Sequence, residues 1–447
     1  MYLKEDLRST FQDMPFAQFV YDEQHPLMKL AALIDWDELL KRLQAFYSRR
    51  QGRPTLPVRA QAGTLMIKFL KNLPDRDTVR YVQENIYAQR FCALTPAQAN
   101  DYMSPATGLT GFRAKIGPAG MALIEEALTS VAEGKSLKRG SKLIVDTTCV
   151  PLDIRYPTDI KLLERVRRVL IGLFQKAKGL GLEVLYRTYN RTARKIFARF
   201  SKLSKPKEKT RIKVHKQMFQ FVRRNLKQLI ALRDKATRQL GPQCRDDMGV
   251  HGFLAQLKEA EIKIRAIMHQ QGFVRRRIFH IPNRIVSFHK DHVRPIVRGK
   301  FPLSTEFGPK VLVAVVRDCA YRVSAFQDNA ADALMITPAL RWFKEKFGRL
   351  PREVLGDRGF YAQWRVRCLK AMGITPGLQQ RGKTVEASPL WRRMIRQRLI
   401  IEARISLVKR KFGWGRCRAR IDEHENSWLG LGLAAMNAHL ACRADTS

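Results

Sequence analysis

The sequence lacks paired cysteines and long apolar runs. Its seven cysteines lie far apart and form no Cys-x-x-Cys pair, which argues against a zinc ribbon or a dithiol redox site and predicts reduced thiols. The longest apolar run spans residues 429–436, whereas a membrane-spanning helix needs about 20 residues. Residues 1–11 contain no apolar segment of the kind found in signal peptides. We therefore expect a cytoplasmic protein that does not enter a membrane.

Acidic residues are also scarce. The 447 residues include 83 lysines and arginines but 40 aspartates and glutamates, which gives a formal net charge of +43. Such an excess favours a polyanionic partner over a neutral metabolite. Because the basic residues run through the whole chain and form no single amphipathic face, nucleic acid is favoured over a membrane surface. A hydrophobic content of 45% argues against a disordered basic tail, and the length predicts more than one domain.

The N-terminal part of the chain has a helical pattern. Apolar residues recur at helical spacing over residues 25–135 and predict short helices joined by tight turns. This pattern fits a helix-turn-helix-like DNA-binding unit and also a plain helical bundle.

A different pattern follows. Residues 142–150 are apolar and β-branched and predict a strand, and residues 311–316 and 321–326 predict a hairpin. Helices then alternate with short strands at 353–356 and 374–376, up to a long helix at 391–412. Apart from a helical insertion after the first strand, this is the element order of an α/β RNase H-like core with a mixed five-stranded sheet.

We thus predict four parts of the chain. Residues 1–135 form an all-α N-terminal domain, and residues 141–155 with 305–425 form the core in two segments. Residues 156–300 form a basic helical insertion, and residues 426–447 form a C-terminal tail.

The insertion contains a dense basic cluster. Lys205, Lys207, Lys209 and Arg211 face a single acid, Glu208, in a loop-like stretch between helices. A contact with the DNA backbone and a solvated basic face both explain such a cluster.

Three carboxylates are candidates for chemistry. Asp146 lies inside an apolar strand, where an unpaired carboxylate is costly. Asp357 follows a short strand and has a glycine on either side. Glu402 shares one helical stripe with Arg398 and Lys409. Taken singly, each has a simpler explanation: a structural acceptor, a turn residue and an i,i+4 ion pair.

Together the three acids predict a definite reaction. Two aspartates at strand positions and a glutamate on a later helix can hold two divalent ions, and carboxylate oxygens suit Mg²⁺ or Mn²⁺. Two such ions support displacement at a phosphodiester. Asp153, Asp159 and Asp318 are weaker candidates as ligands, because they lie at less suitable positions of the predicted strand, loop and turn.

The sequence here resembles the bacterial insertion-sequence transposases of the DDE type, which have an RNase H-like catalytic core. The family signature Tyr-x2-Arg-x3-Glu-x6-Lys is matched at Arg398, Glu402 and Lys409, with Ile395 at the tyrosine position. Residues 144–148 and 354–360 resemble the blocks around the two family aspartates. Residues 156–163 and 293–300, and the N-terminal region, also resemble one branch of the family.

This resemblance implies an enzyme that binds the terminal repeats of its element, cuts the element's ends and joins the freed 3′ hydroxyls to target DNA. It implies Asp146, Asp357 and Glu402 as catalytic metal ligands and DNA phosphate contacts at Arg398, Lys409 and Arg358. It also implies a DNA-binding N-terminal domain and a homodimer in the complex with double-stranded DNA. A catalytically inactive DNA-binding relic and an RNase H-like nuclease that cuts without joining remain the alternatives.

Overall fold

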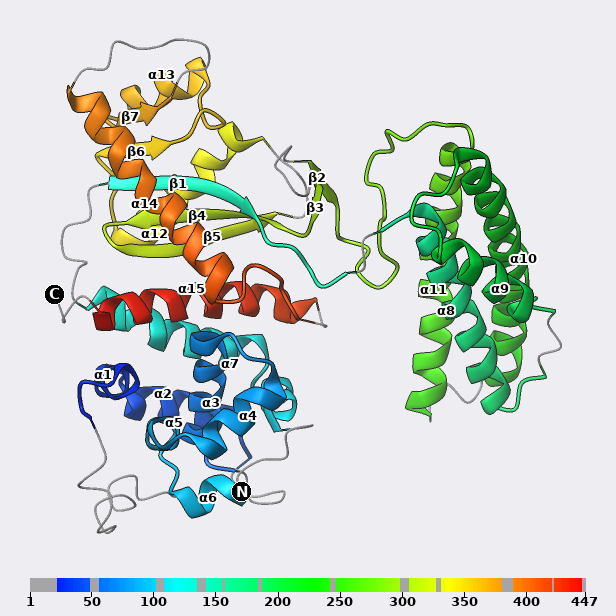
Figure 1. Ribbon diagram of the computed structural model, residues 1–447, viewed down its shortest axis with the longest axis horizontal. Coiled ribbons are helices and arrows are strands. Elements are labelled where there is room, and N and C mark those ends of the chain that lie inside the picture. The colour runs from blue at the N-terminus through cyan, green and yellow to red at the C-terminus, as the bar shows by residue number, and fades with distance from the viewer. Residues whose placement is uncertain are drawn as a thin grey trace. The chain divides into compact units, whose positions relative to one another are not determined.

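The computed structural model describes eleven stretches of the chain and divides it into two compact units. The first unit combines Met1–Asp153 with Ile296–Ser447, and the second is Ile154–Pro295 (Figure 1). The second unit is therefore inserted between two segments of the first. The described residues are 22–48, 56–101, 108–134, 142–154, 157–183, 187–241, 247–297, 305–326, 331–379, 389–419 and 422–443.

A mixed five-stranded sheet forms the centre of the first unit. The strand order is β5-β4-β1-β6-β7, with β1 antiparallel to β4 and parallel to β6. Every residue of β4 is buried, and the residues after Lys310 form an unbroken apolar run, as expected for a strand covered on both faces. The sheet expected for an RNase H-like core is thus confirmed. The strands are β1 (Lys142–Cys149), β4 (Lys310–Val316), β5 (Cys319–Phe326), β6 (Glu353–Gly356) and β7 (Thr375–Leu378).

Helices cover both faces of this sheet. Leu143 and Val145 of β1 pack in one apolar cluster with residues of the 3₁₀ turn η4 (Asp332–Met335), α12 (Ile336–Phe347) and α13 (Gln363–Ala371). The long helix α14 (Pro389–Lys411) contacts β1, β4, β6 and β7 and crosses the other face (Figure 1). A short second sheet pairs β2 (Pro295–Val297) with β3 (Thr305–Phe307).

The described residues between 22 and 134 form helices and no strand. These elements bury an apolar core of their own, in agreement with the helical spacing of the sequence. They are α1 (Pro26–Leu33), α2 (Trp36–Leu43), η1 (Gln44–Phe46), α3 (Val58–Lys71), α4 (Asp75–Glu84), α5 (Ile86–Phe91), α6 (Pro96–Asp101) and α7 (Gly108–Glu133), which kinks at Gly117.

The C-terminal residues form a buried helix. Residues 426–447, predicted to be a tail, lie mostly in α15 (Glu423–Arg443), which packs against α1, α3, α7 and β5. Glycine and alanine make up much of α15, so neighbouring elements approach it closely on several sides. This helix joins the N-terminal helices and the sheet in one unit.

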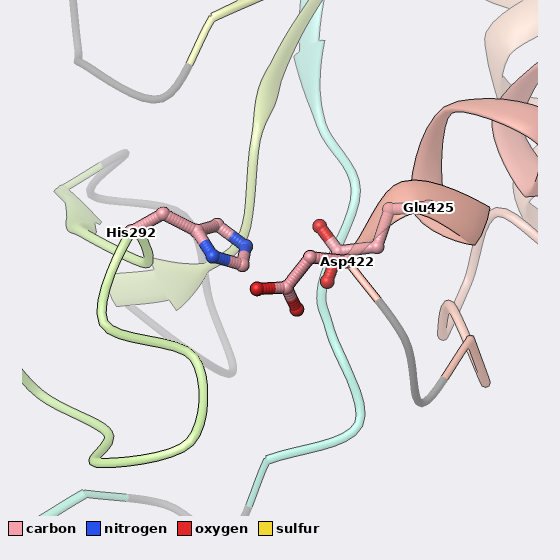
Figure 2. A group of neighbouring side chains, drawn as sticks. All are labelled: His292, Asp422 and Glu425. Carbon is pink, nitrogen blue, oxygen red and sulfur yellow. The ribbon is translucent and has the colours of Figure 1, made fainter. Parts of the chain in front are cut away.

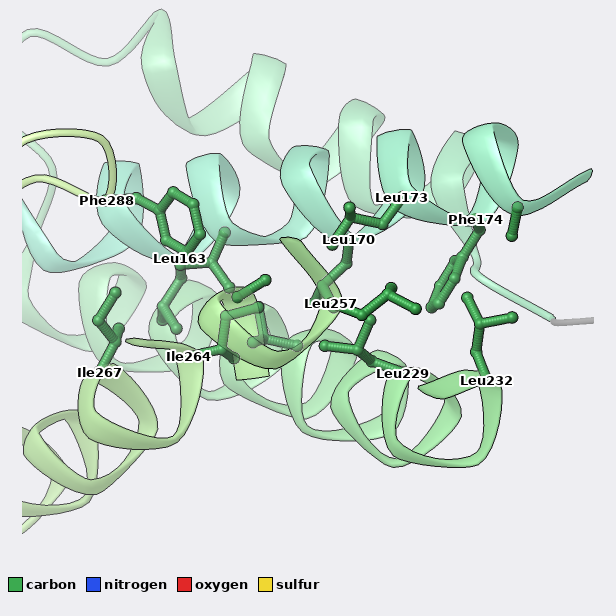
Figure 3. Close-up of a cluster of buried hydrophobic side chains, with 14 of the residues drawn as sticks. Leu163, Leu170, Leu173, Phe174, Leu229, Leu232, Leu257, Ile264, Ile267 and Phe288 are labelled. Carbon is green, nitrogen blue, oxygen red and sulfur yellow. The ribbon is translucent and has the colours of Figure 1, made fainter. Parts of the chain in front are cut away.

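The second unit is a bundle of long helices. Its core contains Leu163, Phe174, Leu229, Leu257 and Ile264, which point toward one another from three helices (Figure 3). Throughout the part of the chain that the structure describes, no helix combines the length and apolar character needed to cross a bilayer. The helices of the bundle are α8 (Asp159–Gly179), α9 (Asn190–Ser201), α10 (Glu208–Leu240) and α11 (Met248–Arg275).

Candidate active site

Asp146 and Asp357 occupy matching positions on two adjacent parallel strands. Ile144 of β1 is paired with Leu355 of β6, and each aspartate lies two residues further along in the same direction. Parallel strands lie about 4.8 Å apart, so this register, continued by two residues, brings the two aspartates side by side. Both are half-buried. The fold therefore places Asp146 in the second half of β1 and Asp357 directly after the neighbouring strand β6.

Short backbone contacts hold both aspartates. The Asp146 Oδ1 atom accepts a hydrogen bond from the Thr147 amide at 2.7 Å, and the Asp357 Oδ1 atom accepts one from the Gly359 amide at 2.8 Å. The second contact forms an Asx turn directly after β6. A Cβ atom at Gly359 would lie 3.1 Å from Asp357 Oδ1 and 2.6 Å from Asp332 Oδ2. A side chain at this position would therefore have to displace the Asp332 carboxylate.

Glu402 lies on α14 next to the helix face that covers the sheet. Ile401 and Val408, seven residues apart, are buried on that face, and Glu402 follows Ile401. The Glu402 carboxylate lies 2.7 Å from Arg398, and the two side chains are 48% and 18% exposed. Lys409 lies 3.8 Å from Glu306 of β3. The predicted stripe of Arg398, Glu402 and Lys409 is therefore present on one continuous helix.

Helix α14 and strand β1 run in the same direction. At the start of β1, Lys142 Nζ donates to Gln397 Oε1 at 2.9 Å. Beyond the end of β1, the Leu152 amide donates to the carbonyl of Phe307. Phe307 follows Glu306, the residue that lies 3.8 Å from Lys409. From Gln397, Glu402 lies about 8 Å along the helix. Asp146 lies about 13 Å along the strand from Lys142. Glu402 thus lies further along α14 in the same direction in which Asp146 lies further along β1.

The three carboxylates are not drawn into one tight cluster. Among the described residues, Asp146, Asp357 and Glu402 do not form a group whose ligand atoms all lie within 4.8 Å of one another. Like charges repel, and the Arg398 guanidinium holds the Glu402 carboxylate. A metal ion shared by all three acids therefore requires a change of position of at least one of these side chains.

Another acidic pair lies at the start of α15. Figure 2 shows Asp422 and Glu425, and the Glu425 amide donates to the Asp422 carbonyl at 3.0 Å. Carboxylates in the first turn interact favourably with the helix dipole, which accounts for their position. His292, which is also drawn, belongs to the second unit, so we do not group it with Asp422 and Glu425.

The weaker candidate acids have other environments. Asp153 pairs with Arg416, and Asp159 accepts hydrogen bonds from Arg284 at 2.8 Å and from Gln271 at 2.7 Å within the second unit. Asp318 lies exposed in the turn between β4 and β5. None of the three lies at the carboxyl ends of β1 and β6.

One acid near the site was not singled out from the sequence. Asp332 Oδ1 accepts a hydrogen bond from Thr147 Oγ1 at 2.8 Å and lies 2.7 Å from Lys310 Nζ. An aspartate at the start of a helical segment is common for backbone reasons alone. No local pattern therefore distinguishes it, and its contacts become visible only in the fold.

Basic residues surround the site and gather in the second unit. Arg358, next to Asp357, is exposed. Lys205 and Lys207 precede α10, Lys209 and Arg211 lie in its first turns, and all four are exposed. Arg277, at the end of α11, lies 3.4 Å from Glu208 and so brings a second basic stretch to this cluster.

Six of the seven cysteines lie in described residues and are free thiols. Burial raises the pKa of Cys92 to about 12 and that of Cys319 to about 11. These thiols therefore stay protonated and unreactive at neutral pH. Cys244 lies outside the described residues.

Comparison with known proteins agrees with the fold. Residues 15–110 match the family described as "Transposase domain (DUF772)", and residues 311–438 match the "Transposase DDE domain". A relative in Rhizobium meliloti, the uncharacterized protein ORF8 in the nfe locus, is 32% identical over 186 residues. This alignment covers 40% of the present chain and 86% of the relative. No solved structure matches the chain.

The matched domains and the mixed sheet define a transposase with a DDE catalytic domain. The chain belongs to the insertion-sequence DDE transposases. The family assignment made from Arg398, Glu402 and Lys409 is thus confirmed. The matched DDE segment contains Asp357 and Glu402, whereas Asp146 precedes it and is separated from it by the second unit.

Proposed function

We propose that this protein is an active DNA transposase that cuts at its element's ends and joins the freed 3′ hydroxyls to target DNA. The observation that carries this proposal is the register of β1 and β6. In this register Asp146 of β1 and Asp357, just after β6, come two residues beyond the paired Ile144 and Leu355, and the helix that carries Glu402 contacts both strands. Asp146, Asp357 and Glu402 are the proposed catalytic residues.

The donor set fits divalent metal ions. Carboxylate oxygens are the ligands that Mg²⁺ and Mn²⁺ prefer, and Asp146, Asp357 and Glu402 would hold two such ions. When bound, the ions supply activation of the attacking oxygen and stabilisation of the leaving oxygen at the phosphodiester. Glu402 would exchange its Arg398 contact for this role, which frees the Arg398 guanidinium for a DNA phosphate.

The basic side chains around the acids would position DNA. Arg358 and Lys409, with Arg398, would bind phosphates close to the cut and offset the negative charge of the carboxylates. The N-terminal segment, residues 1–135, is the part of the chain proposed to bind the terminal repeats. We also propose that the protein acts on double-stranded DNA as a homodimer in the cytoplasm.

The cluster Lys205, Lys207, Lys209 and Arg211 would also bind the DNA backbone. Its side chains are exposed and Arg277 joins it from α11, so positive charge from two chain segments meets at one place. Phe279, 61% exposed, lies two residues beyond Arg277 and offers an aromatic face to a nucleic acid.

The test is cleavage of a labelled DNA that carries the protein's own element end, with Mg²⁺ or Mn²⁺ and with EDTA. We expect metal-dependent nicking at the element boundary and joined products when target DNA is added. Asp146→Asn, Asp357→Asn and Glu402→Gln should each lower the cleavage rate by about a hundredfold or more while end binding persists. Asp153→Asn, an exposed acid paired with Arg416, is the matched control and should cleave normally.

Each alternative has its own result in this experiment. Normal cleavage by one variant removes that residue from the catalytic set. Cleavage without joined products identifies a nuclease. Tight binding without cleavage in either metal identifies an inactive relic, which the isoleucine at position 395 would explain, and Ile395→Tyr is then the variant to examine.

A further inference from the structure

Asp332 connects three segments of the catalytic core. It begins η4, and its Oδ1 atom contacts Thr147 Oγ1 at 2.8 Å and Lys310 Nζ at 2.7 Å. Thr147 is the neighbour of Asp146 on β1, and Lys310 begins β4 opposite Cys149. Thr147 and Lys310 are both buried, whereas the Asp332 side chain is 25% exposed. One carboxylate oxygen is therefore fixed by the two central strands of the sheet.

The other oxygen of Asp332 faces the turn that contains Asp357. A Cβ atom at Gly359 would lie 2.6 Å from Asp332 Oδ2 and 3.1 Å from Asp357 Oδ1. The Asp332 and Asp357 carboxylates therefore both approach the Gly359 α-carbon. The Asp332 side chain thus lies directly against the segment that places the second aspartate.

Local capping does not explain this arrangement. Helix η4 has no side-chain hydrogen bond at its N-cap, and Thr147 and Lys310, which contact Asp332, lie on β1 and β4. The Lys310 ammonium also offsets the negative charge of the Asp332 carboxylate.

We propose that Asp332 is a positioning residue of the active site. Anchored by Thr147 and Lys310, it holds the turn at Gly359 and so keeps Asp357 in register with Asp146. This inference rests on the proposed function, because it assumes that Asp357 is a metal ligand. Outer contacts of this kind set the geometry of metal ligands, and their loss lowers metal affinity by about tenfold to a hundredfold.

The test measures metal binding by the full chain directly. The free Mn²⁺ signal in electron paramagnetic resonance gives the Kd for Mn²⁺, and cleavage gives the Mn²⁺ concentration for half-maximal rate. We expect Asp332→Ala to raise both by about tenfold or more. Asp332→Asn keeps the side-chain size and should give a smaller increase. Asp318→Asn, an exposed turn acid, is the matched control and should leave both values unchanged.

Thermal unfolding of each variant separates positioning from folding. If Asp332 only stabilises the fold, Asp332→Ala lowers the Tm, but the folded protein retains the wild-type Kd for Mn²⁺, and the proposal is overturned. Gly359→Ala supplies a second variant: it keeps the Asp332 carboxylate but adds a Cβ atom 2.6 Å from its Oδ2, so the carboxylate and the turn must shift apart, and Mn²⁺ binding should weaken in the same way.

The result for the wild-type chain separates this inference from the proposed function. Wild-type binding and cleavage with an unaffected Asp332→Ala variant overturn the positioning role alone. A wild-type chain that neither binds Mn²⁺ nor cleaves DNA overturns the metal-dependent function and the positioning role with it.

Discussion

At the scale of single residues, Asp75 shows how a charged group joins three helices. It lies at the start of α4, 2.7 Å from Lys68 of α3, and accepts hydrogen bonds from Arg113 of α7 at 3.1 and 2.5 Å. Burial by itself raises the pKa of Asp75, but the Arg113 hydrogen bond and the Lys68 charge outweigh it and lower the pKa to about 2. The ionised carboxylate is therefore part of the folded state.

Asp75→Asn should destabilise the protein at neutral pH by about 1 kcal/mol, since partial exposure screens the interaction. The pKa in the folded state lies below the ordinary value of 3.8, so this contribution is present above pH 4 and disappears as the pH falls toward 2. Urea unfolding of wild type and variant at several pH values checks this. Asp77→Asn, in the same exposed first turn, is the control. A difference in unfolding free energy between wild type and Asp75→Asn that does not change with pH would contradict the lowered pKa of Asp75.

The residue scale also shows what a sequence pattern can and cannot supply. Arg398, Glu402 and Lys409 were predictable because a helix repeats at fixed spacing, so residues four and seven apart share a stripe. The pairing of Asp146 with Asp357 depends on strand register, and the contacts of Asp332 depend on two other strands. No local rule connects residues so far apart in the sequence, and the fold alone brings them together.

At the scale of whole elements, α15 is the clearest difference between sequence and structure. Its residues are apolar or small on all sides, so they show no amphipathic pattern and gave no helix prediction. A helix that is buried all round needs small residues where backbones meet. A Cβ atom at Gly432 would lie 2.5 Å from the Phe412 carbonyl oxygen.

Gly432→Ala should therefore destabilise the first unit by about 1–3 kcal/mol, because a backbone carbonyl cannot move aside as a flexible side chain can. Gly111→Ala, in an exposed turn of α7 with nothing within 4 Å of the added atom, should be neutral or stabilise by about 0.5 kcal/mol. Thermal and urea unfolding of the two variants measure the contrast. Equal stabilities would show that α15 packs less closely than described.

At the scale of the whole molecule, the excess positive charge lies largely in the inserted unit. In residues 154–295, lysine and arginine outnumber aspartate and glutamate by more than three to one. The apolar periodicity predicted helices in this region, and the helices of the unit bury apolar faces in a common core. The charge of this unit predicted a nucleic-acid partner. The charge alone does not identify the basic residues that contact DNA, because these depend on which segments the fold places together, as it does with those of Lys207 and Arg277.

DNA binding should weaken steeply with salt, because each phosphate contact releases counterions and contributes about 0.9 to the slope of log K against log salt. Lys207→Ala with Lys209→Ala should reduce that slope by up to about 1.8, equally for the element end and for unrelated DNA, since backbone contacts carry no sequence information. Arg341→Ala with Lys344→Ala, two exposed bases of α12, is the matched control and should leave the slope unchanged. Gel-shift titrations over a range of salt concentrations measure all three proteins. An unchanged slope in the Lys207 and Lys209 variant would exclude these lysines from the DNA surface, whereas a change for the element end alone would indicate contacts with bases.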